Sequence, residues 1–485
     1  MGPSAEHQAS TSRVPRARPL GRAIDWLHQR VLIPAFESQL KGRRTFDYWQ
    51  ELERSQWLPQ ADIEALQLTR LRQLLTHAAA TCPYYRDTWR DAGLDPASVT
   101  DLESFRRWPI TGKAVRRAHR EGIRSEAPGI RMLTKGTSGS SGEPFAIDYD
   151  EGSLQRRVAA AFRGYAWAGA PPGVKQFYFW GEPVFARPAA AVRKDRLHHR
   201  LYRRHLHNSL TFRESQVRAV LEDYERANAA VIVAFTRPLY EWARVMQAEG
   251  LRPTPPRAII VGAEKLHDFQ RAVIENVFAA PVFETYGSRE VMLIGAECDR
   301  HRGLHITSEH LLVEIVDEDG APVPPGVEGR VILTDLFNTG APFIRYDIGD
   351  RAVASDRRCE CGRGLPLLER VVGRQLEVVA TRDGRRIPGE VFPFLFKDQY
   401  EIARYQATQE SADRLVIRVQ LRQAWPEEAK ATTLEALRRL VGEGMTIDLR
   451  IVDEIKESAG GKLALVQNPW LAAVRAQEQD AGRQP

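Results

Sequence analysis

The sequence is poor in cysteine and contains no long apolar run. Only four cysteines occur among its 485 residues: Cys82, Cys298, Cys359 and Cys361. So few argue against a disulfide scaffold and favour a reducing compartment, which we expect to be the cytoplasm. No apolar stretch approaches the roughly 20 residues that cross a bilayer, so we expect no transmembrane segment. The first 20 residues lack the apolar part of a secretory signal and predict a disordered basic tail.

The sequence also lacks a strong charge imbalance. Its net charge is +6, with 27% charged and 43% hydrophobic residues, which is typical of a globular protein rather than a disordered one. An excess this small suits anionic ligands but does not call for a nucleic acid partner. The densest basic stretch, residues 193–208, most simply forms a solvated helix face. A peripheral contact with a membrane, a nucleotide or a phosphorylated carrier stays open, and the oligomeric state is not readable.

The order of apolar patterns predicts an α/β fold of two or more domains, because 485 residues exceed one compact core. Residues 21–110 read as mainly helical. Residues 228–295 alternate buried strands with helices, which predicts βαβ units and a mainly parallel sheet. Residues 304–353 predict antiparallel strands, and a small α+β domain follows a boundary near 374. The expected organisation is a tail (1–20), an N-terminal domain (21–373), a C-terminal domain (374–470) and a flexible tail (471–485).

A glycine- and serine-rich stretch, residues 134–147, lies between two apolar runs of strand type. Glycines allow close approach to a ligand, and hydroxyls and free amides can donate to phosphate oxygens. The stretch has neither GxGxxG nor a Walker GxxxxGK[ST] pattern. Its composition alone therefore leaves a surface loop and an anion-binding loop open.

Six segments in order resemble motifs of the adenylate-forming superfamily, which includes acyl- and aryl-CoA synthetases and luciferases. The first, "TSGSSGEP", resembles the phosphate loop. The others are "GAE", "TYGSREV", "FIRYDIGD", "VVGRQLEV" and "SAGGKLALV", at 262–264, 285–291, 343–350, 371–378 and 458–466. The segments at 74–89, 297–306 and 359–374 are most similar to the phenylacetate–CoA ligase and CapK-like branch.

The resemblance implies both a fold and an activity. The fold is a large N-terminal adenylate-forming domain with mainly parallel sheets and a barrel-like portion, followed by a small mobile lid domain. The activity is ATP-dependent conversion of a small aryl or acyl carboxylic acid to an acyl-adenylate, then thioester formation with coenzyme A. One alternative is transfer to an amine or hydroxyl, as in capsule or polysaccharide biosynthesis. Another is a non-catalytic nucleotide-binding scaffold.

The resemblance also implies which residues bind ATP and Mg²⁺. Hydroxyls of the loop would bind phosphates, Tyr286 would face adenine, and Asp350 would accept from the ribose hydroxyls. Glu290 would bind Mg²⁺, and Lys462 would be the catalytic residue that bridges the carboxylate and the α-phosphate. Where the family hinge carries an acid this chain has Leu376, which puts the efficiency of domain rotation in doubt. The nucleotide-binding set is Thr137, Ser138, Gly139, Ser140, Ser141, Gly142, Gly262, Ala263, Glu264, Glu284, Thr285, Tyr286, Gly287, Asp350 and Arg374.

Three cysteines and a histidine form a candidate zinc site. Thiolates and imidazoles suit Zn²⁺, and a structural site needs four such ligands. Cys298, Cys359 and Cys361 match the cysteines of the resembled branch, and His305 matches its histidine better than His301 does. Zinc ligands and ordinary reduced thiols stay open as interpretations of this set.

Overall fold

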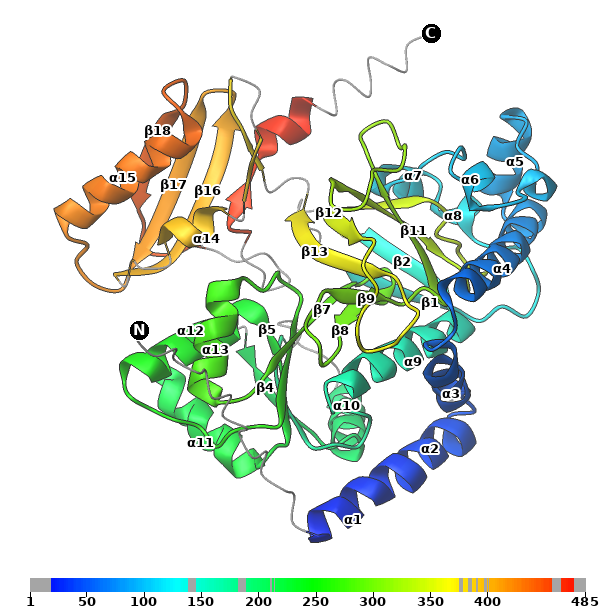
Figure 1. The fold of residues 1–485 in the computed structure, drawn as a ribbon, viewed down its shortest axis with the longest axis horizontal. Coiled ribbons are helices and arrows are strands. Elements are labelled where there is room, and N and C mark those ends of the chain that lie inside the picture. Colours follow the sequence, from blue (N-terminus) through cyan, green and yellow to red (C-terminus); the bar gives the residue numbers. More distant parts are fainter. Residues whose placement is uncertain are drawn as a thin grey trace, which may run out of the picture. The chain divides into compact units, whose positions relative to one another are not determined.

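The computed structural model describes residues 19–137, 145–181, 189–209, 212, 214–374, 378–382, 386–389, 391–396, 399, 401–455 and 464–474. The chain forms two compact units, drawn as a ribbon in Figure 1. The first comprises Met1–Phe46, Tyr165–Trp180 and Arg187–Phe283. The second comprises Asp47–Gly164, Gly181–Ala186 and Glu284–Pro485.

A parallel sheet forms the centre of the first unit, in the strand order β4-β3-β5-β6. Strand β5 is buried at every position, and its alternate side chains enter two different hydrophobic clusters, Ile232 one and Val233 the other. Both faces of the sheet are therefore covered, as parallel sheets require, and the parallel sheet predicted for 228–295 is confirmed. The strands are β3 (Gln176–Trp180), β4 (Arg204–Asn208), β5 (Val231–Phe235) and β6 (Ala258–Gly262), and the helices α10 (Ala189–Leu201), α11 (Val217–Ala227), α12 (Thr236–Ala248) and α13 (Asp268–Phe278).

A helical segment at the start of the chain belongs to the same unit. It consists of α1 (Pro19–Leu27), η1 (His28–Leu32), α2 (Ile33–Ala35) and η2 (Phe36–Leu40). Two acids hold it in place. Asp25 pairs with Arg203, and buried Glu37 accepts a hydrogen bond of 2.9 Å from the Tyr202 hydroxyl.

An antiparallel sheet dominates the second unit, in the order β10-β11-β12-β13-β9-β8-β7. The prediction of antiparallel strands over 304–353 is confirmed, and Gly320, with a φ of 86°, supplies the left-handed residue of the "DEDG" turn between β10 and β11. The strands are β7 (Val282–Ser288), β8 (Met292–Glu297), β9 (Leu304–Ile306), β10 (Leu311–Val316), β11 (Glu328–Asp335), β12 (Tyr346–Ser355) and β13 (Leu367–Arg374).

The glycine- and serine-rich stretch joins two paired strands of the second unit. Strands β1 (Met132–Thr137) and β2 (Phe145–Asp150) are antiparallel, with Thr137 opposite Phe145. The predicted strand–loop–strand setting is therefore confirmed, while residues 138–144 lie outside the described part of the chain.

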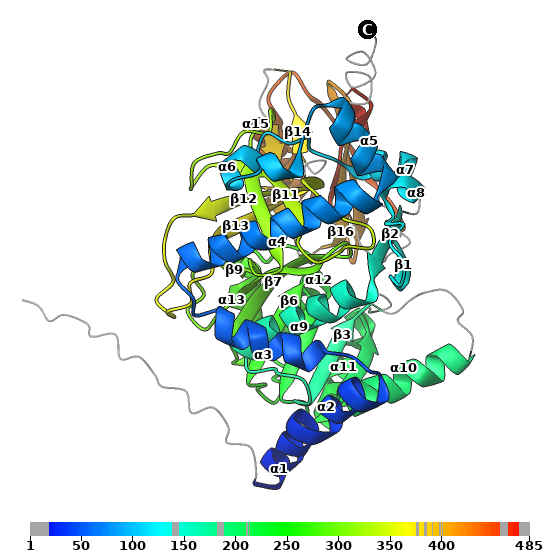
Figure 2. The same ribbon diagram turned by 90° about the vertical axis from the view of Figure 1, so that its right-hand side faces the viewer.

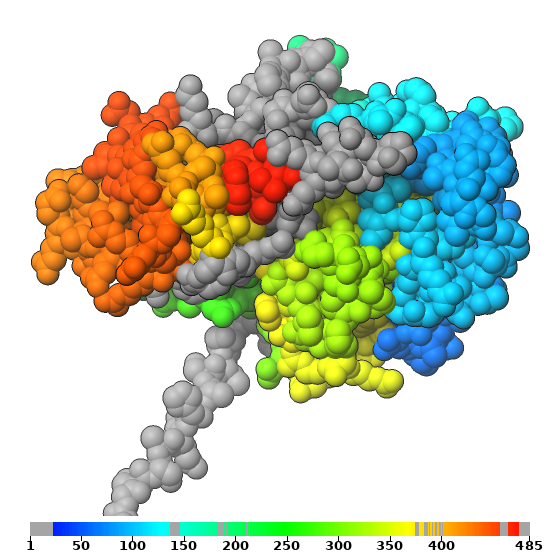
Figure 3. Space-filling model, turned by 90° about the horizontal axis from the view of Figure 1, so that it is seen from above, coloured from blue at the N-terminus to red at the C-terminus, as the bar shows by residue number. Residues whose placement is uncertain are grey.

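Helices of the second unit pack on this framework, and two buried ion pairs fasten one of them. In α9, Arg163 contacts Glu309 in two places, at 2.5 and 3.0 Å, and Arg157 contacts Asp335 at 2.7 Å. The apolar side of α4 packs near Leu312 and Leu336, and in Figure 3 the blue part of the chain lies beside the yellow-green part. The helices are α3 (Thr45–Ser55), α4 (Gln60–Thr81), α5 (Pro83–Asp91), η3 (Pro96–Ser98), α6 (Leu102–Phe105), α7 (Lys113–Ala118), α8 (Arg120–Ile123) and α9 (Glu151–Trp167).

The carboxyl-terminal part has a sheet and a hydrophobic core of its own. Its four strands follow the order β18-β17-β16-β19, with β16 and β17 antiparallel and the outer pairs parallel. The core draws only on residues from 379 to 466, so the expected small α+β domain is confirmed, while its boundary near 374 stays a prediction. The elements are β14 (Val378–Ala380), β15 (Arg386–Pro388), α14 (Val391–Phe396), β16 (Ile402–Ser411), β17 (Arg414–Leu421), α15 (Glu427–Val441), β18 (Thr446–Ile451) and β19 (Val466–Gln467). Among the described residues, no helix is long and apolar enough to cross a membrane.

Variants of the buried Arg163–Glu309 ion pair can test how much this pair contributes to the stability of the protein. Both side chains are at most 1% exposed, so Arg163→Met leaves a buried carboxylate without its partner and should cost about 3–5 kcal/mol of unfolding free energy. Adding Glu309→Met should restore most of the loss. The control is Arg439→Met, which removes an exposed pair with Glu435 and should leave stability nearly unchanged. Denaturant unfolding measures all four proteins, and equal behaviour of the two single Arg variants would contradict the assignment.

Candidate active site and metal centre

The first group of predicted nucleotide-binding residues lies at the carboxyl end of β6. Gly262 ends that strand opposite Phe235 of β5, and Ala263 follows with a φ of 69°. Glu264 then accepts a 3.0 Å hydrogen bond from the backbone N–H of Arg237, in the first turn of α12. Ligands of open α/β sheets bind at the carboxyl ends of strands, so the local geometry agrees with the predicted role, which stays a prediction.

The two tyrosine-containing motifs of the second unit contact each other reciprocally. The Tyr286 hydroxyl, from "TYGSREV", donates to Asp350 Oδ2 at 2.8 Å. The Tyr346 hydroxyl, from "FIRYDIGD", donates to Glu290 Oε1 at 3.4 Å. The tyrosine of each motif therefore donates a hydrogen bond to the carboxylate of the other motif. The structure brings these predicted residues together in one place.

This contact requires the antiparallel sheet to curl. Three strands separate β7 from β12 in the sheet order, and a spacing of about 4.8 Å per strand would put them about 19 Å apart if the sheet were flat. The pairing register shifts beside both motifs, between Tyr286 and Gly287 and between Arg351 and Ala352. Such bulges bend strands and increase their twist, so they provide the curvature that the hydrogen bonds need.

Residues beside Tyr286 fix the local backbone. Glu284 donates its backbone N–H to Glu297 Oε2 at 2.8 Å, and Thr285 pairs with Ala296 of β8. A Cβ on Gly287 would lie 2.1 Å from the backbone oxygen of Met292, so only glycine fits there. These residues shape the end of β7.

The Glu290 carboxylate fits the part predicted for it, a ligand of Mg²⁺. It is 5% exposed, and its described contacts, the Tyr346 hydroxyl and Lys113 Nζ at 3.8 Å, both go to Oε1. Within the described residues Oε2 accepts no hydrogen bond. Mg²⁺ in nucleotide sites takes one or two carboxylates together with phosphates and water, and one carboxylate oxygen meets that need.

Sequence reasoning missed Lys113 and the role of Tyr346. Lys113 begins α7, and the preceding Thr111 exchanges backbone hydrogen bonds with Arg345 and Asp347, which attaches this helix to the start of β12. No motif marks Lys113, because its place depends on a long-range pairing. Tyr346 lies inside the motif "FIRYDIGD", and its place in that motif was the sequence feature that could have indicated its role.

Several predicted residues fall at or beyond the limits of the described chain. Thr137 ends β1, and Arg374 ends β13 opposite Asp350. Outside the described residues lie Ser138, Gly139, Ser140, Ser141, Gly142, Leu376 and Lys462, and their roles stay predictions.

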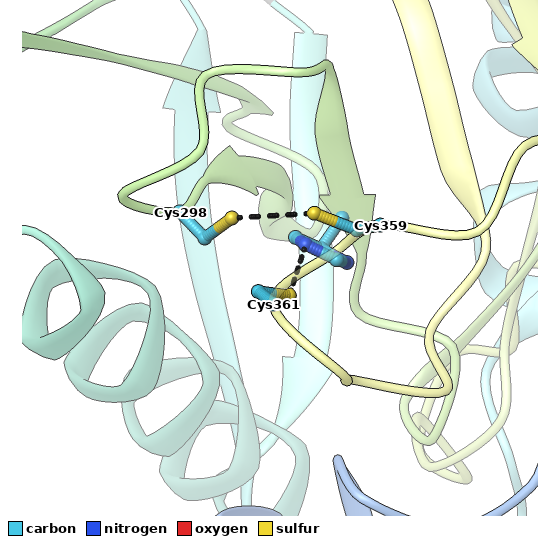
Figure 4. Close-up of side chains that lie close together, drawn as sticks. Cys298, Cys359 and Cys361 are labelled. Carbon is cyan, nitrogen blue, oxygen red and sulfur yellow. Dashed lines mark hydrogen bonds between the residues drawn. The ribbon is translucent and has the colours of Figure 1, made fainter.

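The proposed zinc ligands gather at one point of the second unit. The donor atoms of Cys298, His305, Cys359 and Cys361 all lie within 4.8 Å of one another. Figure 4 shows the three cysteine side chains pointing toward one another, with Cys298 Sγ 3.6 Å from Cys359 Sγ and Cys361 Sγ 3.3 Å from His305 Nε2. Ligands of a tetrahedral zinc ion lie about 3.5–3.8 Å apart, given bonds of about 2.1–2.3 Å. The donor set and its spacing therefore fit zinc.

Histidine 305, and not its neighbour, completes this cluster. His305 is fully buried, and burial lowers its pKa to about 4, so its ring is in the neutral form that binds metals. His301 instead contacts Glu297 Oε2 at 3.2 Å. Cys82 is buried elsewhere, in the core beside α4, and burial raises the pKa of its thiol to about 11.

The chain is similar in sequence and fold to known proteins. Residues 379–469 match the CapK C-terminal domain family. The chain is 26% identical over 448 residues to a phenylacetate–coenzyme A ligase of Thermus thermophilus, covering 89% of this chain and 97% of that relative. A crystal structure of 2-hydroxyisobutyryl-CoA ligase in the postadenylation state superposes with a TM-score of 0.66 at 20% identity, covering 89% and 94%. The chain has the fold of the adenylate-forming CoA ligases.

A further relative supports the same assignment. The phenylacetate–coenzyme A ligase of Escherichia coli is 24% identical over 408 residues, covering 81% of this chain and 91% of that one. The resemblance drawn from the sequence motifs is confirmed, and so is the fold class of these CoA ligases.

The reciprocal contacts predict a measurable coupling between Tyr286 and Asp350. Hydrogen bonds to charged groups contribute about 1.5–3 kcal/mol, so a double-mutant cycle of Tyr286→Phe and Asp350→Asn should return a coupling energy of that size. Unfolding free energies from denaturant titration provide the measurement. Tyr85→Phe is the control partner, because the Tyr85 hydroxyl donates to the Pro342 carbonyl and not to Asp350. Additive effects of Tyr286→Phe and Asp350→Asn would show that the contact does not form.

Proposed function

We propose that the protein activates a carboxylic acid with ATP and then transfers the acyl group to coenzyme A. The observation that carries the proposal is the reciprocal contact of two motifs, which holds Tyr286, Glu290 and Asp350 together. The relatives support it: the curated ones are phenylacetate–coenzyme A ligases. A related crystal structure, with a TM-score of 0.57 at 21% identity, contains 2-hydroxyisobutyryl-CoA ligase with its acyl-AMP and CoA in the thioesterification state.

In the first half-reaction, a carboxylate oxygen of the substrate attacks the α-phosphorus of ATP. The bond from that phosphorus to the bridging oxygen breaks, and pyrophosphate leaves. We assign Thr137, Ser138, Ser140 and Ser141 to the phosphates, and Lys462 to the meeting point of the carboxylate and the α-phosphate. When bound at Glu290, Mg²⁺ supplies charge neutralisation for the phosphates.

In the second half-reaction, the thiol sulfur of coenzyme A attacks the acyl carbon, and AMP leaves as the thiol proton passes to solvent. The intermediate replaces the poor leaving group of a carboxylate with AMP. We propose that Tyr286 and Asp350 hold the adenosine through both steps, at adenine and ribose. Leu376 lies in the hinge motif, so we propose that it affects how efficiently the lid domain moves between the two steps. Until coenzyme A attacks, the site must also keep water away from the acyl-adenylate.

The acid is proposed to be a small aryl or acyl acid. The rings of Trp180 and Phe235 lie 4.2 Å apart at the carboxyl ends of β3 and β5, in the first unit. Aromatic side chains that pack in pairs provide large apolar contact areas, and we propose that the apolar part of the acid packs against them.

One experiment tests the activity and the role of Lys462 together. Pyrophosphate release is measured over a panel of aryl and acyl acids, and AMP release is measured with coenzyme A, amines or sugars as acceptors. We expect acid-dependent pyrophosphate release and AMP release stimulated by coenzyme A. Lys462→Ala should lower adenylate formation at least about a hundredfold, because one charge-stabilising contact in the transition state contributes about that much.

The matched control for that variant is Lys430→Ala, a partly exposed lysine of α15 that pairs with Glu427. It should keep full activity, and Lys462→Ala should still bind ATP. Normal ATP–pyrophosphate exchange in Lys462→Ala would remove the assignment of that lysine. Stimulation by an amine or sugar instead of coenzyme A would identify the alternative acceptor, and no acid-dependent release across the panel would favour a nucleotide-binding scaffold.

We also propose that Cys298, His305, Cys359 and Cys361 bind a structural zinc ion. Four protein ligands leave no open position for substrate, which is the pattern of a structural and not a catalytic site. The ion would connect the ends of β8 and β9 to the segment between β12 and β13.

The zinc proposal predicts a metal content. The purified protein should contain about one zinc per chain, and Cys359→Ser should lose most of it because one of four ligands is removed. Cys82→Ser is the control, since this buried cysteine lies outside the cluster, and it should keep its zinc. Elemental analysis after removal of loosely bound metal measures both. Equal zinc content in the two variants would mean that the cysteines are ordinary thiols.

A further inference from the structure

The helical segment at the start of the first unit presents apolar side chains to solvent. Ile24, Leu27 and Val31 are 39%, 42% and 43% exposed, and their spacing of three and four residues puts them on one side of the helix. Trp26 is 60% exposed and Leu32 38%. Large apolar side chains grouped on one exposed element mark an interaction site more often than scattered single ones do.

A second helix of the same unit adds unpaired positive charge beside this segment. Helix α10 packs against it, with the rings of Phe36 and His198 6.4 Å apart, and both views show the two elements together (Figures 1 and 2). Leu197, on α10, is 69% exposed. The cations exposed on the two elements are Arg30, Arg193, Lys194, Arg196 and Arg200, and none forms an ion pair with any residue that the structure describes.

The acids of these elements do not balance those cations. Asp25 is occupied by Arg203, and also lies 3.5 Å from Arg257. Glu37 is 2% exposed and contacts Tyr202 and Thr45. Asp195, the remaining acid, is half-buried. The exposed side thus combines apolar groups with excess positive charge.

We propose that this surface, the α1–α10 face, docks the protein on an anionic lipid bilayer without spanning it. A helix with apolar groups on one side and cations nearby lies in the membrane interface, where the apolar side chains enter the acyl boundary and the cations meet anionic headgroups. The interpretation of residues 193–208 as one solvated helix face is wrong beyond Leu201, because α10 ends there and Arg204–Asn208 form β4, and the proposal extends it for the helical part.

The charges favour a bilayer over a second copy of the chain. An isologous dimer places the same patch of each copy against the other. The five unpaired cations of one copy would then meet those of its partner, and like charges brought together oppose association. A bilayer containing anionic lipid offers the opposite charge and an apolar phase at once.

Co-sedimentation with vesicles tests the proposal on the full-length protein. The vesicles contain phosphatidylcholine alone or equal parts of phosphatidylcholine and phosphatidylglycerol. We expect binding to the anionic vesicles, weakened by salt, and little binding to the neutral ones. Leu27→Glu/Val31→Glu and, separately, Arg193→Glu/Arg196→Glu should each weaken binding at least about tenfold, since each cation near the surface contributes about fivefold.

Matched controls separate the face from general surface effects. Val327 is 46% exposed and Arg438 is also exposed, and both lie in the second unit. Val327→Glu and Arg438→Glu should bind like the wild type, and all variants should keep their unfolding profile. Absence of binding by the wild type, or equal binding by face and control variants, overturns the proposal. A wild-type dimer that Leu27→Glu/Val31→Glu converts to monomer, without vesicle binding, assigns the face to a second copy instead.

Discussion

The hydrogen bonds that link Tyr286 to Asp350 and Tyr346 to Glu290 set the shape of the second unit. They join strands that the sheet order separates by three others, so the sheet must curl until its two motif-bearing strands face each other. Curling in turn needs bulges, and the register shifts occur beside the motif residues themselves. The carboxylates proposed to bind ribose and Mg²⁺ thus lie in one place because the sheet is bent.

Much of this architecture could be predicted from local patterns. Buried runs such as "VIVAF" alternating with amphipathic helices indicate parallel strands, and apolar runs either side of a Gly/Ser stretch indicate paired strands. The grouping of Cys298, His305, Cys359 and Cys361 could also be predicted from the sequence, because only a few side-chain types bind zinc.

Long-range pairing was beyond those patterns. Lys113 reaches Glu290 because Thr111 pairs with the start of β12, more than two hundred residues away in the sequence. Nothing within a few residues of Lys113 reports that pairing. The curl of the sheet is similarly a property of several strands and their bulges, and no single strand pattern contains it. The roles of Lys462 and of the glycine- and serine-rich stretch stay predictions that rest on their motifs alone.

Although the net charge of the protein is modest, the two units differ in how their charged side chains are paired. In the second unit, Arg157 and Arg163 are buried and each is matched to a carboxylate. In the first, the cations of α10 face solvent while Asp25 and Glu37 are turned to the protein. Charged side chains in the core must be paired, because burying a lone ion costs free energy. Charged side chains that bind a partner must instead be exposed and free of ion pairs within the protein. Basic residues therefore stabilise the core of the second unit through ion pairs, and in the first unit they are proposed to attract an anionic surface.

The proposed zinc ion at the four-residue cluster would make one part of the fold depend on a metal supplied from outside the chain. Its ligands come from three separate segments of the chain. A bound ion would hold these segments together and so close the loops between them, whereas without it strand pairing alone would have to do so. A shortage of zinc would then lower the stability of this part of the fold. The Cys298 and Cys359 sulfur atoms lie 3.6 Å apart, so an oxidant that joined them in a disulfide would remove two of the four proposed zinc ligands, and the oxidation state of the cell and its zinc supply would act on the same pair of sulfur atoms.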